Sequence, residues 1–191
     1  MCQLLSDPAF YRLLLRFDED LAAAERPLGC RVCGRRLEAS DFPRKPRGLA
    51  TRLGDRFAER FSFCCADRCC RKRRTPASLR FLGRKVYLGA IVVLISSMRC
   101  GPSPVRLRRL HELVGVSRHT LSRWRRWWRE TLPASRFWAQ AAGMLMPPVN
   151  LAELPASLLE RFAGTSEQER LTRLLRWLSP LTSGSPEAHA A

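Results

Sequence analysis

Six of the eight cysteines lie in two close groups whose spacing suits a metal ion. Cys30 and Cys33 are separated by two residues and followed by Gly34, which fits the sharp turn that brings backbone amides close to sulfur. Some thirty residues later the chain reads Cys64-Cys65-Ala66-Asp67-Arg68-Cys69-Cys70. Two thiol pairs on two tight turns complete the tetrahedron of a structural zinc site. We therefore expect one Zn2+ per chain, held by Cys30, Cys33, Cys65 and Cys70.

The choice of the second thiol pair stays open, because either Cys64 or Cys65 can pair with either Cys69 or Cys70. We favour Cys65 and Cys70, which have four residues between them, and keep the other two as alternates. Reduced buried thiols and a rubredoxin-like iron centre are the competing interpretations. The two isolated cysteines are predicted to be plain thiols. The first residues lack the pattern of a secretory signal, and this favours metal binding over disulfides.

A second pattern with chemical meaning covers residues 105–130. Apolar residues recur at helical spacing on both sides of Gly115, which can adopt the left-handed conformation of a tight turn. Val116 is expected to plug that turn, and Ser117 to cap the helix that follows. This arrangement predicts a helix-turn-helix, whose second helix reads duplex DNA. Its inner face consists of Leu107, Leu110, Val114, Leu121, Trp124 and Trp128.

The outward face of the second helix is rich in arginine, the best reader of guanine. Residues near the start of a recognition helix touch base edges. The residues expected to contact bases are Arg118, His119, Ser122, Arg123 and Arg126. The residues expected to contact phosphates are Arg106, Arg108, Arg109, Arg125 and Arg129. A further basic run, expected to be a flexible loop that binds phosphates without selectivity, is Arg71-Lys72-Arg73-Arg74.

Two plainer interpretations of this helix stay open. Its basic face can be a solvated surface that reads no sequence. Its three tryptophans, Trp124, Trp127 and Trp128, can be stacking platforms for single strands, although their helical spacing favours the core.

The charge of the chain is concentrated in the same region. The 191 residues contain 34 Lys and Arg against 17 Asp and Glu, a formal net charge of +17. Residues 68–136 alone hold 18 of these cations and two acids, and such concentration indicates a surface for a polyanion. With 46% hydrophobic residues the chain is not a disordered basic tail. The longest apolar stretch, residues 86–98, is shorter than the roughly 20 residues of a membrane span, so we expect no membrane contact.

The elements that must position these residues are mainly helical. An N-terminal helix is expected over residues 7–25, with Asp7 as N-cap and Pro8 in its first turn. The first helix of a tri-helical unit is expected from Phe81 to Met98, because few strands are that long.

The C-terminal third predicts short helices, the clearest over residues 167–178. Ser166 and Glu169 form its capping box. Its leucine stripe is expected either to pack on the helix-turn-helix or to remain as a face for self-association or for a partner. Deletion of residues 165–191 separates the two roles, because only packing makes the fold depend on this segment.

The expected fold class is mainly α, with a small zinc ribbon followed by a tri-helical helix-turn-helix domain and short C-terminal helices. The expected divisions are an N-terminal helix (1–27), a zinc-ribbon-like cysteine module (28–75), the helix-turn-helix domain (76–136), a C-terminal helical extension (137–179) and a disordered tail (180–191).

The order of these parts resembles a known family. A cysteine ribbon ends in Arg71-Lys72-Arg73-Arg74-Thr75-Pro76, an apolar helix follows, and then comes Leu113-Val114-Gly115-Val116-Ser117-Arg118. Over residues 28–132 this is similar to the N-terminal half of bacterial insertion-sequence transposases. The resemblance implies recognition of terminal repeats in duplex DNA. In that family a nuclease domain with an Asp-Asp-Glu triad follows.

The catalytic half of such a transposase is not predicted here. The chain has no Asp after Asp67, and about 55 residues follow the predicted helix-turn-helix. Two-metal strand transfer needs several converging carboxylates. We therefore expect a non-enzymatic, cytoplasmic, nucleoid-associated protein that binds duplex DNA in a mobile-element context, alone or with a separately encoded recombinase. A transcriptional regulator and an RNA-binding zinc ribbon are the alternatives.

Overall fold

The mainly α fold is confirmed by the computed structural model, which describes residues 4, 7–44, 46, 54–82, 87–98 and 103–183. The α-helices in this part of the chain are α2 (Pro8–Glu25), α3 (Asp55–Ala58), α4 (Gly89–Ser96), α5 (Pro104–Val114), α6 (Arg118–Arg126), α7 (Arg136–Ala141), α8 (Ala156–Leu159) and α9 (Glu167–Leu178). A π-helical turn, η3 (Trp127–Thr131), extends α6. Short 3-10 turns are η1 (Arg26–Leu28), η4 (Ala142–Met144), η5 (Leu151–Glu153) and η6 (Ser179–Thr182).

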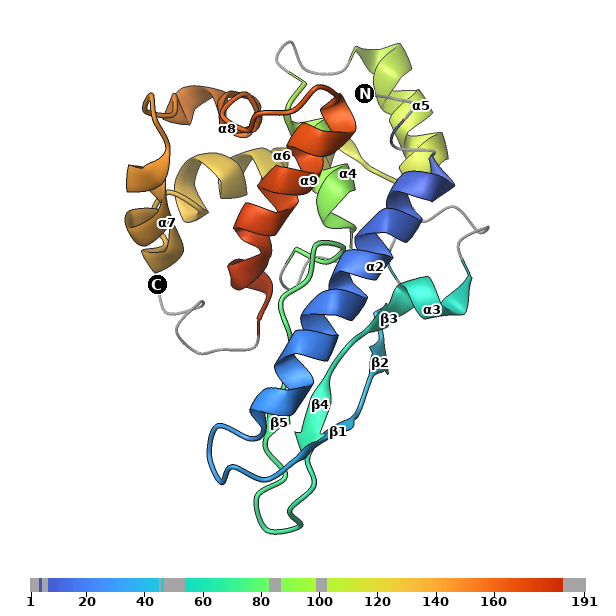
Figure 1. Ribbon diagram of the computed structural model, residues 1–191. Coiled ribbons are helices and arrows are strands. Elements are labelled where there is room, and N and C mark those ends of the chain that lie inside the picture. Colours follow the sequence, from blue (N-terminus) through green and yellow to red (C-terminus); the bar gives the residue numbers. More distant parts are fainter. Residues whose placement is uncertain are drawn as a thin grey trace.

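Two small antiparallel sheets form the other part of the molecule. The first has the strand order β1-β4-β5, and the second pairs β2 with β3. The strands are β1 (Leu37–Ala39), β2 (Phe42–Pro43), β3 (Glu59–Arg60), β4 (Phe63–Cys65) and β5 (Arg73–Arg74). Figure 1 shows these strands at the lower end of the molecule and most of the helices at the upper end.

Helix α2 connects the two parts. Asp7 caps it as expected, since its carboxylate accepts from the Ala9 amide at 2.8 Å. Phe10 and Leu14 belong to the large helical core, and Ala22 to a small core around the strands. Leu15 packs against both cores. The helix therefore runs diagonally from the helical part to the sheets (Figure 1).

Helix α4 lies at the centre of the large core. All of its residues from Gly89 to Ser96 are buried, as expected for a helix that is apolar on every side. The prediction of a helix from Phe81 to Met98 is wrong at its start, because Phe81 pairs with Leu88 in an antiparallel bridge. Residues 83–86 lie outside the described part of the chain.

Helix α9 packs directly on α4. The leucine stripe of α9 is buried, with at most 2% of each leucine exposed: Leu171, Leu174, Leu175 and Leu178. A Cβ atom at Gly89 would lie 3.1 Å from Leu175 Cδ2, so the two helices approach where α4 has no side chain. Of the two predicted roles for the stripe, packing is the one that the structure confirms.

The capping box of α9 is half formed. Ser166 Oγ accepts from the Glu169 amide at 3.1 Å, as predicted. The Glu169 carboxylate, however, accepts from the Thr165 amide at 3.0 Å instead of from the Ser166 amide.

The disordered tail was predicted to begin at residue 180, but residues 180–183 are packed against the rest of the protein. Turn η6 buries Leu181 and Thr182. The Thr182 hydroxyl accepts from the Ser78 amide at 2.7 Å, and the Thr182 carbonyl accepts from Arg60 at 3.1 Å. These contacts order residues 180–183, and residues 184–191 lie outside the described part.

A buried ion pair that the sequence reading missed joins the helical part to the strands. Arg80 and Asp18 are both completely buried, with 2.8 Å between Nε and Oδ2. The Arg80 guanidinium also donates to the carbonyls of Phe57 and Glu59, at 2.5 and 2.9 Å. One side chain thus ties α2 to the segment that leads into the cysteine module. Burial lowers the pKa of Arg80, while the Asp18 carboxylate opposes that shift.

Candidate functional site

Four cysteines from distant parts of the sequence meet at the lower end of the molecule. Their sulfur atoms all lie within 4.8 Å of one another, and the four residues are those that the spacing predicted: Cys30, Cys33, Cys65 and Cys70. The Cys30–Cys70 and Cys33–Cys65 sulfur distances are 3.7 and 3.4 Å. A tetrahedral ion with bonds of about 2.3 Å to sulfur places its ligands about 3.8 Å apart. The cluster therefore has the size needed to hold a metal ion.

The first pair is held by a tight turn. The Gly34 amide donates to the Cys30 carbonyl at 2.9 Å, and the Cys30 amide donates to the Arg35 carbonyl at 2.8 Å. Gly34 has a φ of 72° and confirms the expected turn. Gly29 is needed as well, because its φ is 67° and an added Cβ would lie 3.0 Å from the Gly34 carbonyl oxygen.

The second pair is selected by strand β4 and by Asp67. Adjacent residues of a strand point to opposite faces, so Cys65 is buried in the cluster while the Cys64 thiol contacts the Arg71 carbonyl at 3.5 Å. The Asp67 carboxylate accepts from the amides of Cys69 and Cys70, at 2.8 and 3.1 Å. This turn leaves Cys69 exposed and directs Cys70 inward. The favoured pair is confirmed as part of the cluster.

The protein environment shifts the thiol pKa values in opposite directions. The backbone amides of Cys33 and Val32 lower the pKa of Cys30 to about 6. Burial raises the pKa of Cys65 to about 12. Backbone amides therefore stabilise the thiolate of Cys30, whereas the Cys65 thiol would lose its proton only on binding a cation.

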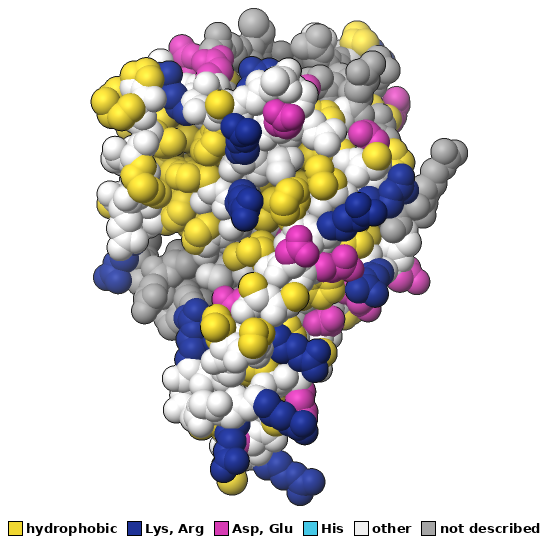
Figure 2. Space-filling view, viewed as in Figure 1, with side chains coloured by type: hydrophobic (Ala, Val, Ile, Leu, Met, Phe, Trp, Pro, Cys, Tyr) yellow, Lys and Arg dark blue, Asp and Glu magenta, His cyan; other side chains and the backbone are white. Residues whose placement is uncertain are grey.

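The basic run beside the cluster is not a flexible loop at its second half. Arg73 donates to the Ser40 carbonyl at 3.2 Å and lies over the Phe42 ring. Arg74 donates to the Gly29 carbonyl at 2.9 Å and forms an ion pair with Glu25. Both residues belong to β5, so their guanidinium groups are used to hold the module together. Arg71, Lys72 and Arg73 are exposed, and Arg74 is half-buried. Figure 2 shows Lys and Arg side chains around this lower end of the molecule.

The pair α5–α6 has the local structure that its residues predicted. Gly115 has a φ of 65°, and Val116 is completely buried in the turn. Ser117 caps α6, because its hydroxyl accepts from the Thr120 amide at 3.2 Å. The hydroxyl of Tyr87 adds a bond to the Gly115 carbonyl at 2.9 Å, which fixes the turn against the core.

The tryptophans of this segment are mostly core residues. Trp124 is 4% exposed and packs edge-on against Tyr87, and Trp128 is completely buried. Trp127 is half-buried and lies against Trp128. Trp124 and Trp128 are thus closed to bases, and the core interpretation is confirmed for these two.

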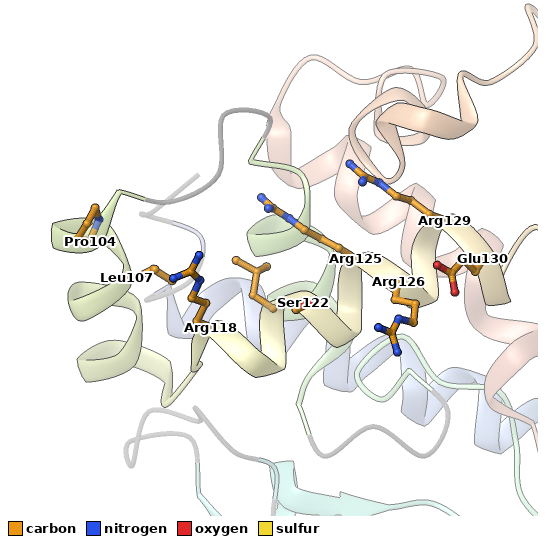
Figure 3. A pocket seen from close by; sticks show the side chains of 9 residues that line it. Pro104, Leu107, Arg118, Ser122, Arg125, Arg126, Arg129 and Glu130 are labelled. Atoms are coloured by element: carbon orange, nitrogen blue, oxygen red, sulfur yellow. The ribbon is translucent and has the colours of Figure 1, made fainter.

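A groove of about 560 Å3 runs along α6 beside the start of α5. Five of the residues that were predicted to contact nucleic acid line this groove: Arg118, Ser122, Arg125, Arg126 and Arg129. Figure 3 shows these side chains projecting from α6 and, for Arg129, from the π-helical turn η3 that extends it. The sequence reading missed the other lining residues, which are Pro104, Leu107, Leu121 and Glu130. Helical spacing would have found Leu121, three residues after Arg118, and Glu130, four residues after Arg126, whereas Pro104 reaches the groove only through packing.

The remaining predicted contacts lie elsewhere. His119 and Arg123 are exposed on α6 but do not line the groove, and Arg108 is exposed on α5. The side chains of Arg106 and Arg109 lie outside the described part of the structure. Arg125 is half-buried and donates to the Met98 carbonyl at 3.2 Å, so it also connects α6 to the end of the α4 segment.

Comparison with protein-family models, with curated proteins and with solved structures finds no match for this chain. In the part of the chain that the structure describes, every helix is too short or too polar to cross a membrane. The case for a function therefore rests on the cysteine cluster and on the groove.

Proposed function

We propose that this chain is a zinc-containing protein of transposase-like type that binds duplex DNA through a helix-turn-helix and has no nuclease activity of its own. The observation that carries the proposal is the row of arginines along α6, at the surface of an otherwise well-packed helix. Four guanidinium groups line one groove there, at Arg118, Arg125, Arg126 and Arg129. Such a concentration of like charge is costly unless the surface meets a polyanion.

Helix α6 has the properties of a recognition helix. Its first turn exposes Arg118 and His119, and its inner residues Leu121 and Trp124 are buried. A recognition helix contacts base edges with residues near its N-terminus. The burial of Trp124 and Trp128 argues against RNA or single strands stacked on these rings, so duplex DNA is the better-supported ligand.

Zinc is the metal that best suits the cysteine cluster. All four ligands are thiols, and a closed site of four thiolates is typical of structural zinc. The cluster would hold the two cysteine turns together as a zinc ribbon, because the small core around it contains few apolar residues. Elemental analysis of the purified protein should find about one zinc per chain, and Cys30→Ala should abolish it. A red-brown protein that contains iron would contradict this assignment.

The mobile-element context rests on the order of the parts, with a cysteine module before a basic helix pair. A separately encoded recombinase would supply the missing strand transfer, and because the leucine stripe of α9 is buried, it would have to dock on another surface of the chain. The experiment that tests the function is the selection of bound sites from random duplexes. A site resembling a terminal repeat supports the proposal, and a palindrome would favour a transcriptional regulator.

Direct binding is measured by fluorescence anisotropy at matched salt. We expect the selected duplex to bind more tightly than structured RNA of equal length. Equal or stronger binding of the RNA would contradict the proposal.

A further inference from the structure

The exposed face of α6 and η3 divides into two stripes. Residues spaced by four, three and four positions lie above one another on a helix. One stripe consists of Arg118, Ser122, Arg125 and Arg129. The other consists of His119, Arg123, Arg126 and Glu130.

The groove treats the two stripes differently. Every member of the Arg118 stripe lines it. From the other stripe only the last two members, Arg126 and Glu130, line the groove, while His119 and Arg123 do not. The π-helical turn η3 begins at Trp127 and includes Glu130, and its wider turn changes the angular position of the residues that follow. At the N-terminal half of α6, which is the half that a recognition helix uses for base contacts, the division between the stripes is therefore clean.

The chemistry of the groove suits the backbone of a nucleic-acid strand. Among the residues that the structure describes, no carboxylate forms an ion pair with Arg118, Arg126 or Arg129. The walls also contain the apolar side chains of Pro104, Leu107 and Leu121. A DNA strand presents phosphates, which bind guanidinium groups, and deoxyribose rings, which pack on apolar surface. The carboxylates of an acidic peptide would pair with the arginines, but such a peptide would leave the apolar wall without a function.

Arg125 gives this edge of α6 a fixed position. Its guanidinium donates to the Met98 carbonyl, so part of the donor set is held by the protein, while the residue also lines the groove. A partly bonded arginine loses less side-chain entropy when it binds a phosphate.

We propose that the groove beside α5 seats the sugar-phosphate backbone of one DNA strand, and that His119 and Arg123 alone read bases at the start of α6. The inference rests on the proposed duplex-DNA binding and makes it more specific. It reverses the sequence-based assignment of Arg118, which becomes a phosphate contact. Ser122 likewise becomes a contact to the backbone.

The test compares Arg118→Ala with Arg123→Ala on the selected duplex and on a scrambled duplex over a range of salt. Arg118→Ala should weaken both duplexes by the same factor and lower the salt slope by about one. Arg123→Ala should weaken the selected duplex about 5- to 140-fold, and the scrambled duplex much less. Arg173→Ala is the control of equal charge, because Arg173 is exposed on α9 and away from the groove.

A second measurement identifies the phosphate itself. Neutral methylphosphonates are placed one at a time in the selected site. At one position the methylphosphonate should weaken binding by the wild type but not by Arg118→Ala, because that variant already lacks the guanidinium that contacts this phosphate. No such position, or loss of discrimination by Arg118→Ala, would overturn the inference while leaving duplex binding intact. A wild type that binds neither duplex would overturn the proposed function as well.

Discussion

Arginine has opposite uses in the cysteine module and on α6. Arg73 and Arg74 in β5 donate to the carbonyls of Ser40 and Gly29, and Arg74 also pairs with Glu25. On α6, Arg118 and Arg126 are exposed and, in the described part of the structure, have no ion-pair partner. Both regions are rich in arginine, yet β5 uses its guanidinium groups to hold the module together, whereas Arg118 and Arg126 present theirs to solvent.

The difference follows from the kind of element that carries the arginines. A short strand leaves carbonyl groups at its ends and edges unpaired, and a long guanidinium can satisfy several of them. A helix satisfies its own carbonyls, so an arginine on its surface finds an acceptor only where another segment lies beside it, as Met98 does for Arg125. Arg60 is another arginine that supports the fold, because it donates to the Thr182 carbonyl. Burial lowers its pKa to about 10. The number of positive charges in a sequence therefore overstates how much positively charged surface is available to a ligand.

The largest effect is expected when the proposed metal site is removed, because the cysteine module has little core of its own. Cys65→Ser should abolish metal binding and unfold the β1-β4-β5 sheet while α4 and α9 stay folded. Structural zinc contributes about 10–16 kcal/mol in zinc-finger peptides. Metal analysis and amide hydrogen exchange measure the two effects. The matched control is Cys64→Ser, which should keep the metal because that thiol points away; equal loss of metal would contradict the ligand set.

The second largest effect is expected at the buried ion pair. Asp18→Asn leaves the Arg80 guanidinium buried without its counter-charge, which should reduce the free energy of unfolding by about 3–5 kcal/mol. Glu19→Gln removes the neighbouring, more exposed pair with Arg56 and should cost at most about 1 kcal/mol. Urea unfolding of both variants gives the comparison. Similar small losses would mean that Arg80 does not hold the two parts together.

The two uses of arginine are separated directly by a pair of single substitutions. Arg74→Ala should lower the free energy of unfolding by about 1–3 kcal/mol, because Glu25 and the Gly29 carbonyl lose a charged partner. Its affinity for duplex DNA should stay within about a factor of two. Arg129→Ala should leave stability within about 0.5 kcal/mol and lower the salt slope of DNA binding by about one. The reverse pattern would refute the distinction.

The smallest expected effect concerns the turn that orients α6. Gly115→Ala forces a side chain into a φ of 65° and should cost about 1–2 kcal/mol. Gly143→Ala is the control, since Gly143 has an ordinary φ and no atom within 4 Å of the added Cβ. Thermal unfolding distinguishes the two. Equal stability of both variants would show that the turn tolerates other conformations.

Local signals in the sequence were enough to predict the caps, turns and ligands. Asp7 and Ser117 cap their helices because a short polar side chain satisfies amides that no earlier carbonyl can reach. Cys30 and Cys33 lie on a turn that their own neighbours define. The choice of Cys65 over Cys64 also follows from the alternation of a strand, although the strand itself was not predicted.

Contacts between distant segments were beyond the sequence alone. The pairing of Phe81 with Leu88 removed the predicted first turns of the α4 segment, and Thr182 became ordered because Ser78 and Arg60 happen to lie beside it. Nothing in the local sequence distinguishes Arg80 from the other basic residues, because its ion-pair partner, Asp18, lies sixty-two positions away.

The sequence by itself determined the first cysteine pair of the cluster, where α5 and α6 meet and which face of α6 is apolar, because these properties depend on spacing along one segment. Only the tertiary structure decided which arginines remain open to a ligand. A guanidinium becomes structural when a carbonyl or carboxylate from another segment comes within hydrogen-bond distance, and this depends on how the whole chain packs.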